Sequence, residues 1–558
     1  MNIFAGIKHF IFIFMKNITL LLGILLALVG CQSASNSEGY FKDNGYQADT
    51  VYISGQVRNF PEGKTLQIVS MKFVEDEQVK LEITPDSLGY FEARIPVINS
   101  ARLFLYYFMQ GDIVTLFAEP GEKVEIHSDW KKGTLSFLGE HAQAHQDVYN
   151  YQCYVDSLLL THPYIDYMDR TITHEEFLHR ITAEYNKKDS LLNAYRKLHP
   201  HMSERAVAQV RTTHQNRFAF LLMQRRFSLN WLKAEAFPDD YMQKADSIFR
   251  CLPRPYTLSE LIFIRDYLDY YYEHQGGVAK HMQMMFDYLE KNKGMVLSKE
   301  QQMDTELLNS PEMKIALQEA YEALIQTPEY EAALIDRWSG GIELVPMPTD
   351  LKELMYAFYH YYYLDGSRKA MHEQNMRRFL SLVKNQDIAR PVVELQQKYV
   401  ELEKQDMGET LSSLGYEHLK NCTTGEELFR EILKPCEGKV VYLDVWGTWC
   451  GPCKKEMEYA STIKQAMKGK EVVFLYLANG SPEESWKNII KEYSLTGEQV
   501  VHYNLPNKLQ NILEKYLQIK HYPTYLLIDR NGEIVDREPP RPSSENRLVD
   551  YLNKCLEN

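Results

Sequence analysis

The sequence at residues 446–453 is WGTWCGPC. An apolar run from Val440 to Val445 precedes it, and a segment with helical periodicity, Lys454 to Met467, follows it. A Cys-x-x-Cys pair on a strand-to-helix turn places the first sulfur at the helix N-terminus, where free N–H groups and the helix dipole favour the thiolate. We therefore predict that Cys450 is the nucleophile and that Cys453, one helical turn later, resolves the mixed disulfide.

Two other uses of such a pair are disfavoured by the surrounding residues. Half of a zinc site would need a second ligand pair at suitable spacing, but the next cysteine is Cys555, and His502 and His521 lie apart. A peroxiredoxin would need a Thr-x-x-Cys setting, whereas Thr448 stands two residues before Cys450. The sequence therefore predicts thiol-disulfide exchange and no metal.

The motif resembles the active site of a known family. Trp449 to Cys453 matches the thioredoxin motif, and Trp446 to Trp449 is similar to the TlpA/ResA-like branch of membrane-tethered thiol-disulfide oxidoreductases. The resemblance covers residues 423–558, about a quarter of the chain. It implies an α/β thioredoxin-like fold in which the two cysteines are supported by Trp446, Trp449, Gly451, Pro452, Tyr522 and Thr524.

Other landmarks of such a domain follow in order. The pattern predicts a strand over Glu471–Ala478, a helix opened by Ser481-Pro482-Glu483-Glu484 with Ser481 as N-cap, and a hairpin turn at Asn531-Gly532. Pro523 matches the family's cis-proline, which implies a cis bond that faces Cys450. The backbone of the preceding residue would then be free to pair with an extended substrate.

Asp444 lies six residues before Cys450 and, by the resemblance, matches a buried carboxylate under the active site. Burial raises the pKa of such a group, which can then relay a proton to or from Cys453; a strand-edge or helix-capping role is the alternative. The chain departs from thioredoxin in two ways. No Lys within Val472 to Ala478 is available to partner the carboxylate, and Tyr522 is bulkier than the usual aliphatic residue before the cis-proline.

The dipeptide Gly451-Pro452 between the cysteines is that of the reducing thioredoxin, whose potential lies far below that of the strongly oxidising periplasmic enzyme. We therefore predict a protein-disulfide reductase that needs no cofactor beyond its redox-active disulfide. The resemblance implies a membrane thiol as electron donor and disulfide-containing envelope proteins as clients. An isomerase or weak oxidase is the alternative within this chemistry. A binding or sensor lipoprotein with an accessory redox domain is the alternative from another class.

The N-terminal residues indicate lipid anchoring. Cys31 closes the apolar run Ile18 to Gly30, which follows Lys16, and this order resembles a bacterial lipoprotein signal. We predict a signal peptide over residues 1–30, a lipidated Cys31 in the cell envelope, facing the periplasm or on the outer membrane, and a flexible tether over 31–50. An ordinary transmembrane anchor is less favoured because the clean apolar stretch is shorter than the ~20 residues that a span needs.

The 558 residues are too many for one core, and a composition of 45% hydrophobic and 25% charged residues is that of a folded protein. A net charge of −14 argues against binding to nucleic acid. Short alternating runs predict an antiparallel β-sandwich over 51–140, and helical periodicity predicts an all-α domain over 141–420 before the thioredoxin-like domain at 421–558.

Capping boxes mark helix starts in the α domain, at Thr173 with Glu176 and at Ser298 with Gln301. Its many aromatic residues favour interhelical packing over a ligand platform. They are Tyr267, Tyr270, Tyr271, Tyr272, Tyr356, Phe358, Tyr359, Tyr361, Tyr362 and Tyr363. Five further cysteines are interpreted as buried or incidental thiols, namely Cys153, Cys251, Cys422, Cys436 and Cys555.

Overall fold

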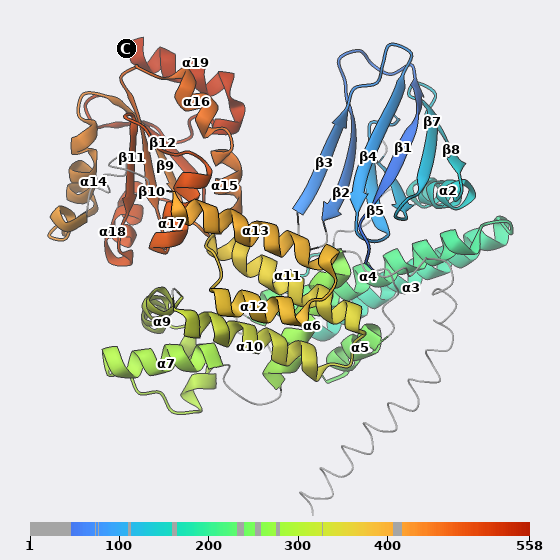
Figure 1. Cartoon of the computed structure of the whole chain (residues 1–558), viewed down its shortest axis with the longest axis horizontal. Helices are drawn as coiled ribbons and strands as arrows, with labels where there is room; N and C mark the ends of the chain where they lie inside the picture. The colour runs from blue at the N-terminus through green and yellow to red at the C-terminus, as the bar shows by residue number, and fades with distance from the viewer. Residues whose placement is uncertain are drawn as a thin grey trace, which may run out of the picture. The chain divides into compact units, whose positions relative to one another are not determined.

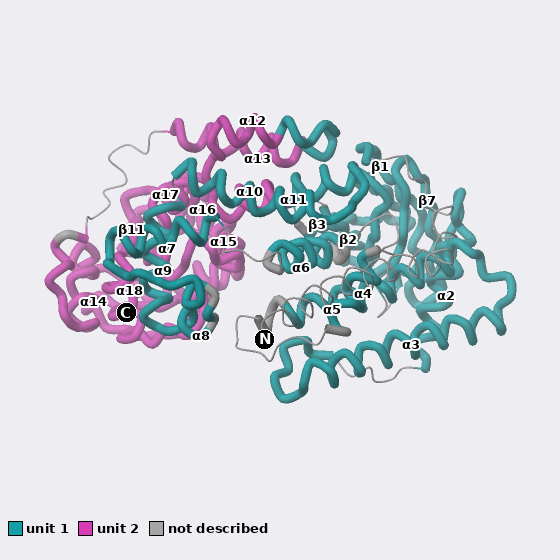
Figure 2. Tube along the Cα trace, turned by 90° about the horizontal axis from the view of Figure 1, so that it is seen from below, with its two compact units in different colours: residues 1–358, 380–389 teal, residues 359–379, 390–558 magenta. Residues whose placement is uncertain are grey.

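The computed structural model describes residues 46–72, 74–75, 77–109, 113–158, 165–230, 239–250, 258–274, 280–325, 327–405 and 416–557. The predicted signal peptide, the predicted lipidation site Cys31, most of the predicted tether, and Cys251 lie outside these ranges. None of the helices in the described ranges combines the length and apolar character that crossing a bilayer requires. The chain divides into two compact units, residues 1–358 with 380–389 and residues 359–379 with 390–558 (Figure 2).

The first unit begins with two four-stranded sheets, ordered β4-β1-β7-β8 and β3-β2-β5-β6 (Figure 1). Their inner side chains, such as Val51, Leu66 and Leu103, form one buried core, as the alternating pattern predicts. One pairing differs from the antiparallel prediction, because β1 and β7 run parallel. The strands are β1 (Asp49–Arg58), β2 (Leu66–Lys72), β3 (Glu77–Ile83), β4 (Tyr90–Val97), β5 (Ala101–Tyr106), β6 (Ile113–Ala118), β7 (Lys123–Asp129) and β8 (Thr134–Gly139).

Helices make up the rest of the first unit, in agreement with the predicted all-α region. They are α2 (Ala142–Leu158), α3 (His174–Leu198), α4 (Glu204–Asn230), α5 (Asp239–Arg250), α6 (Leu258–His274), α7 (Lys280–Lys293), α8 (Thr305–Leu308), α9 (Pro311–Leu324), α10 (Pro328–Leu344) and the greater part of α11 (Thr349–Ser367). Thr173 caps α3 as predicted. Ser298 and Gln301 exchange hydrogen bonds, but they open only a short 3₁₀ turn, Gln301–Met303, rather than an α-helix.

Two buried ion pairs join the sandwich to the helices of the same unit. Both acids flank the turn between β6 and β7: Glu122 lies 2.8 Å from Nε2 of His145 on α2, and Glu119 pairs with Arg205 on α4. Burial alone would raise the pKa of Glu122, but the hydrogen bond and charge of His145 hold it below its ordinary value. The turn between β6 and β7 therefore attaches the sandwich to the helices.

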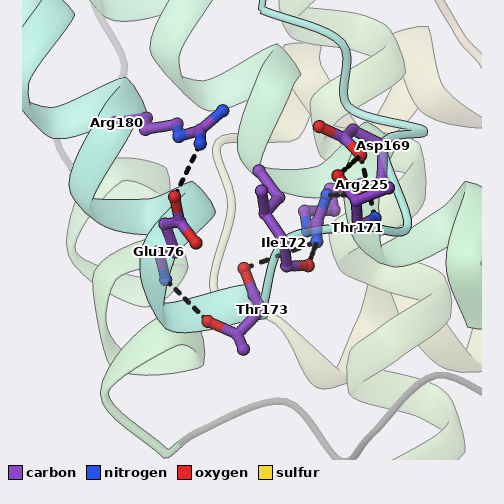
Figure 3. A network of polar contacts seen from close by, with 7 residues as sticks. All are labelled: Asp169, Thr171, Ile172, Thr173, Glu176, Arg180 and Arg225. Atoms are coloured by element: carbon purple, nitrogen blue, oxygen red, sulfur yellow. Dashed lines mark hydrogen bonds and ion pairs between the residues drawn. The ribbon is translucent and has the colours of Figure 1, made fainter.

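Arg225 on α4 is almost fully buried, and its guanidinium group organises the segment that leads into α3 (Figure 3). It donates hydrogen bonds to the backbone carbonyls of Asp169 at 3.0 Å and Ile172 at 2.7 Å, and to Nδ1 of His174 at 3.1 Å. Its guanidinium carbon also lies 4.5 Å from the ring centroid of Phe177. One buried cation therefore satisfies several backbone and side-chain acceptors of this segment.

The second unit contains a five-stranded sheet ordered β11-β10-β9-β12-β13, in which β12 runs antiparallel to β9 (Figure 1). Two hydrophobic clusters cover its two faces. Leu428 of α14 and Leu513 of α18 belong to one, and Ile463 of α16, Trp486 of α17 and Leu552 of α19 belong to the other. The elements are α14 (Gly425–Leu433), β9 (Val440–Trp446), α15 (Gly451–Met457), α16 (Ala460–Ala466), β10 (Val472–Ala478), α17 (Glu483–Glu492), β11 (Val500–Asn504), α18 (Asn507–Leu517), β12 (Thr524–Ile528), β13 (Ile534–Asp536) and α19 (Asn546–Glu557).

The end of α11, most of α12 (Glu373–Leu382) and most of α13 (Gln386–Lys404) belong to the same unit as this sheet. The boundary predicted at residue 420 stays a prediction. The compact unit that contains the α/β part also includes residues 359–379 and 390–405. Buried Arg368 connects them: its guanidinium group contacts Tyr399 Oη at 3.1 Å and Glu492 of α17 at 3.2 Å, and its carbonyl accepts a hydrogen bond from Asn488.

We expect Arg225→Ala to lower the free energy of unfolding of the first unit by about 3 kcal/mol, because several acceptors lose their donor at once and a buried side chain is removed. Arg180→Ala is the matched control: Arg180 forms an exposed pair with Glu176 on α3 at 2.6 Å, and its loss should cost less than about 0.5 kcal/mol. Hydrogen exchange of α3 and α4 amides measures both. Equal protection in the two variants would contradict the role given to Arg225.

Candidate functional site

The two cysteines of the motif lie where β9 ends and α15 begins. Every residue of β9 is buried, and Cys450 takes the N-cap position of the helix, where its Sγ accepts a hydrogen bond from the Cys453 N–H at 3.1 Å. The cysteines form a disulfide whose Cα atoms are 5.3 Å apart. Cys450 is 4% exposed and Cys453 is fully buried, so a partner can reach only the first sulfur.

The loop that carries the motif is fixed by residues that follow β10. The Thr448 N–H donates to Ser481 Oγ at 3.0 Å, and that hydroxyl donates to the Asn479 carbonyl at 2.9 Å. The prediction that Ser481 caps α17 is therefore wrong. Pro482 occupies the N-cap position without a side-chain hydrogen bond, because the Ser481 hydroxyl is already used to hold the active-site loop.

An aromatic wall formed by Trp449 and Tyr522 stands beside Cys450. Trp449 is 54% exposed, and its ring meets that of Tyr522 edge to face at a centroid distance of 4.9 Å. Trp449 Nε1 donates to the Asn479 carbonyl at 3.1 Å, and the Asn479 amide donates to Tyr522 Oη at 2.7 Å. One residue, Asn479, thus holds both rings.

Glu514 on α18 completes this network. Its Oε1 accepts hydrogen bonds from Tyr522 Oη at 2.5 Å and from Gln510 Nε2 at 2.7 Å, as well as from Asn479. Burial and the adjacent Glu514 raise the pKa of Tyr522 far above its ordinary value, so its hydroxyl remains a donor. The bulk of Tyr522, noted as a departure from thioredoxin, gives the residue a hydroxyl that an aliphatic side chain would lack. Sequence reasoning missed Asn479 and Glu514, because the two polar residues become neighbours only in the fold.

The other predicted residues of the site fall at the same end of the sheet. The Tyr522–Pro523 peptide bond is cis, and Thr524 begins β12 opposite Val445, next to the motif. Thr524 Oγ1 donates to the carbonyl of His521 at 2.6 Å and so closes the turn around the proline.

Different physical constraints explain the tryptophan and the two glycines of the motif. Trp446 is fully buried beneath the loop. A Cβ on Gly447 would lie 2.6 Å from Nε1 of Trp449, so only glycine lets that ring pack over the backbone. A Cβ on Gly451 would meet no atom within 4 Å, and both Gly451 and Pro452 are exposed. Gly451 is therefore not required by packing.

Asp444 is buried on the face of β9 that also carries Trp446 and faces the cluster containing Cys453. Its Oδ1 has no hydrogen-bond partner in the described part of the chain. Burial, and next the charge of Glu456 on α15, raise the pKa of Asp444 well above its ordinary value. The two carboxyl groups line a cavity of about 10 Å³ that is bounded by Met457, roughly the room that one water molecule occupies.

Two charged residues of α15 were not identified from the sequence. Glu456 accepts hydrogen bonds from the backbone N–H of Ser543 at 2.8 Å and from its hydroxyl at 3.1 Å, which orients the carboxylate near Asp444. Lys454 follows Cys453 directly and is buried, and burial, with the nearby cation Arg368, lowers its pKa to about 8. The alternation of polar and apolar residues in a one- or two-turn helix is too short to show which of them face inward.

Outside the motif, the cysteines Cys422 and Cys436 are buried thiols and Cys555 is half-buried. Burial raises the pKa of Cys436 to about 11, so this thiol stays protonated and unreactive. Within the described ranges, no three metal-ligating side chains gather into a group.

We expect Tyr522→Phe to lower the free energy of unfolding of the thioredoxin-like part by about 1 to 2 kcal/mol, because Glu514 and Asn479 lose a half-buried hydrogen-bond partner. Tyr516→Phe on the same helix as Glu514 is the control, since Tyr516 is 41% exposed and loss of an exposed hydroxyl changes stability by less than about 0.5 kcal/mol. Chemical denaturation followed by tryptophan fluorescence compares the two. A Tyr522→Phe variant as stable as the control would contradict the network.

The raised pKa of Asp444 determines the direction in which the stability of the domain changes with pH. Folding favours the protonated carboxyl, so its contribution to stability is present at low pH and is lost as the pH rises from the unfolded pKa near 3.8 through the higher folded pKa. We therefore expect Asp444→Asn to raise the unfolding temperature more at about pH 8 than at about pH 5.

Asp529 supplies a control of opposite sign. Backbone hydrogen bonds at the β12–β13 turn, from Glu533 first, hold its pKa below the ordinary value, so its stabilising contribution is lost as the pH falls through that low value. Asp529→Asn should lower the unfolding temperature, and more so at about pH 8 than at acid pH. The same pH trend in both variants would show that the ionisation of Asp444 is not the cause.

Comparisons with known proteins agree with this geometry. A family model described as thioredoxin-like matches residues 438–534. The thiol-disulfide oxidoreductase ResA of Bacillus cereus is 34% identical over 122 residues, which are 22% of this chain and 66% of the relative. The ResA of Bacillus subtilis (strain 168) is 29% identical over 121 residues, 22% of this chain and 64% of the relative. The chain thus spans just under two thirds of the length of these relatives.

Among solved structures, the thioredoxin domain of a thiol-disulfide oxidoreductase from Bacteroides vulgatus is 27% identical, with 22% of this chain and 84% of that chain covered and a TM-score of 0.20. The family model matches the part of the chain that forms the five-stranded sheet. The same part contains the redox pair and the cis-proline. The C-terminal α/β part of this chain therefore has a thioredoxin-like fold and is similar to the ResA thiol-disulfide oxidoreductases.

Proposed function

We propose that this chain is a membrane-tethered protein-disulfide reductase that works through Cys450 and Cys453. The observation that carries the proposal is the asymmetry of the pair. Cys450 caps α15 and accepts a hydrogen bond from the Cys453 N–H, whereas Cys453 is fully buried behind it. The first sulfur is thus stabilised as a thiolate and accessible to a client, and the second can react only with the first.

The reaction takes place in two exchanges. The Cys450 thiolate attacks one sulfur of the client disulfide, a mixed disulfide forms, and the other client sulfur leaves as a thiolate. Cys453 then loses its proton, attacks Cys450 Sγ and releases the second client sulfur. Two electrons pass from the enzyme dithiol to the client, whose disulfide becomes two thiols, and the Cys450–Cys453 disulfide remains.

Asp444 is the group that we propose takes the proton of Cys453. It is buried on the face of β9 that also carries Trp446. Because burial raises its pKa well above the ordinary value, the ionised carboxylate is a stronger base than an exposed aspartate, and it can take this proton and later return it. Glu456 shares the small cavity with Asp444 and reaches the surface near Ser543. A proton can therefore leave the buried carboxyl toward solvent through this second carboxylate.

The proposals for the direction of the redox reaction and for the membrane location of the enzyme are based on the sequence. Gly451-Pro452 favours a low potential, so the enzyme would draw electrons from a membrane thiol and reduce disulfide-containing envelope proteins. Lipid on Cys31 would tether it to the membrane. An isomerase or weak oxidase has the same geometry, and the equilibrium potential of the pair in a glutathione titration separates these activities. A binding lipoprotein would retain its capture function without the pair.

We expect Cys450→Ser in the full chain to abolish reduction of insulin disulfides, because the attacking sulfur is lost. Cys453→Ala should still attack but accumulate mixed disulfides with clients, since no second thiol resolves them. Cys555→Ala is the control and should keep full activity, because that thiol lies outside the motif. Insulin precipitation with dithiothreitol and non-reducing electrophoresis give the two readouts. Full reductase activity in Cys450→Ser would overturn the proposal.

A further inference from the structure

The thioredoxin-like domain has a groove on the side of β12 away from β9. The cavity measures about 490 Å³ and is formed by the end of α18, the start of β12 and the segment after β13. Pro523 and Thr524 line it, and so do the cationic residues Lys520, Arg537 and Arg541.

The register of the sheet places this groove at the redox end of the domain. Thr524 pairs with Val445, and the next residue of β9 begins the motif that carries Cys450. Pro523 lines the groove and directly follows Tyr522, whose ring contacts Trp449. A client held in a mixed disulfide at Cys450 would therefore reach the groove with residues close to its reacting cysteine.

The charge of the groove is opposite to that of the whole chain. Lys520, Arg537 and Arg541 are exposed, and the one acidic side chain that lines the groove is Glu538. In the described part of the chain, none of the three cations forms an ion pair with a carboxylate. Arg537 uses one N–H group on the carbonyl of Leu517 at 2.9 Å, which leaves its other donors available. In a chain of net charge −14, three cations against one carboxylate around a single groove form a local positive field.

We propose that this groove binds an acidic segment of the client polypeptide next to the cysteine that undergoes exchange. The inference rests on the proposed reductase function and adds a preference among its clients. Carboxylates of Asp and Glu would pair with Lys520 and Arg541, and the free guanidinium donors of Arg537 would add a third contact. The overall negative charge repels acidic proteins at long range, so the groove would be the surface on which such clients can dock.

Two synthetic peptides test the proposal. Both carry one intramolecular disulfide and differ only in a flank of three residues, Glu-Asp-Glu in one and Gln-Asn-Gln in the other. The ratio of kcat/KM for their reduction by the full chain is measured at low and at high salt. We expect the acidic peptide to be favoured by about tenfold at low salt, the effect of three exposed ion pairs, and by much less at high salt.

Lys520→Glu with Arg541→Glu should lower this ratio to about one or below. Arg537 is left in place because its bond to Leu517 also supports the fold. The matched control is Lys439→Glu with Lys468→Glu, which changes the net charge equally. These residues precede β9 and β10 and so lie at the opposite end of the sheet. The control should keep most of the preference.

The outcomes separate this inference from the function on which it rests. If neither peptide is reduced by the unmodified chain, the proposed reductase function fails and this inference falls with it. If both peptides are reduced at equal rates, the function stands and the groove proposal is overturned. An equal loss of preference in the two double variants would also overturn it, since net charge alone would explain the preference. If a variant fails to fold, the salt dependence of the unmodified chain still tests the proposal. A preference for the acidic peptide that does not weaken at high salt would contradict it.

Discussion

Cys450 occupies the N-cap of α15, a position where Ser, Thr, Asp or Asn usually places an oxygen. Its sulfur therefore accepts the hydrogen bond that the helix needs at its first turn, and a negative charge on that sulfur strengthens the same bond. The position depends on β9, whose seven residues are all buried and which ends directly beneath the loop. β9 is paired with β10 on one side and with β12 on the other, so the hydrogen bonds of the sheet fix the position of the sulfur that follows it.

The buried carboxyl of Asp444 follows from the same strand. Side chains alternate along β9, and the residue two positions before Trp446 must face the same side as that tryptophan. An ionised carboxylate there would have no cation beside it, since β10 supplies no lysine. Burial therefore favours the neutral acid, and the nearby Glu456 strengthens this effect. In place of a buried ion pair, the site has two carboxyl groups around a space for about one water.

How far the sequence predicts this structure depends on whether a feature is local. The hairpin at Asn531-Gly532 and the cap at Thr173 are short local patterns, and the redox motif and the cis-proline were expected from the family resemblance. The fold classes of all three regions were predicted. Ser481 shows the limit, because a serine before proline and two glutamates fits an N-cap by every local rule. Its hydroxyl instead holds Thr448, a contact 33 residues away along the chain. Asn479, Glu514 and Arg225 acquire their roles only through such distant partners, and the parallel pairing of β1 with β7 likewise has no local signal.

The helices that join the α/β part in the second unit affect the redox site through α17. Asn488 and Glu492 of that helix bind Arg368, and Ser485 donates to the carbonyl of Ser367, so α17 is fixed along most of its length. The residues just before α17, Asn479 and Ser481, are those that hold Trp449 and the motif loop. A shift of the helix would move both, and with them the wall beside Cys450. The segments 359–379 and 390–405 therefore support the motif loop through their contacts with α17.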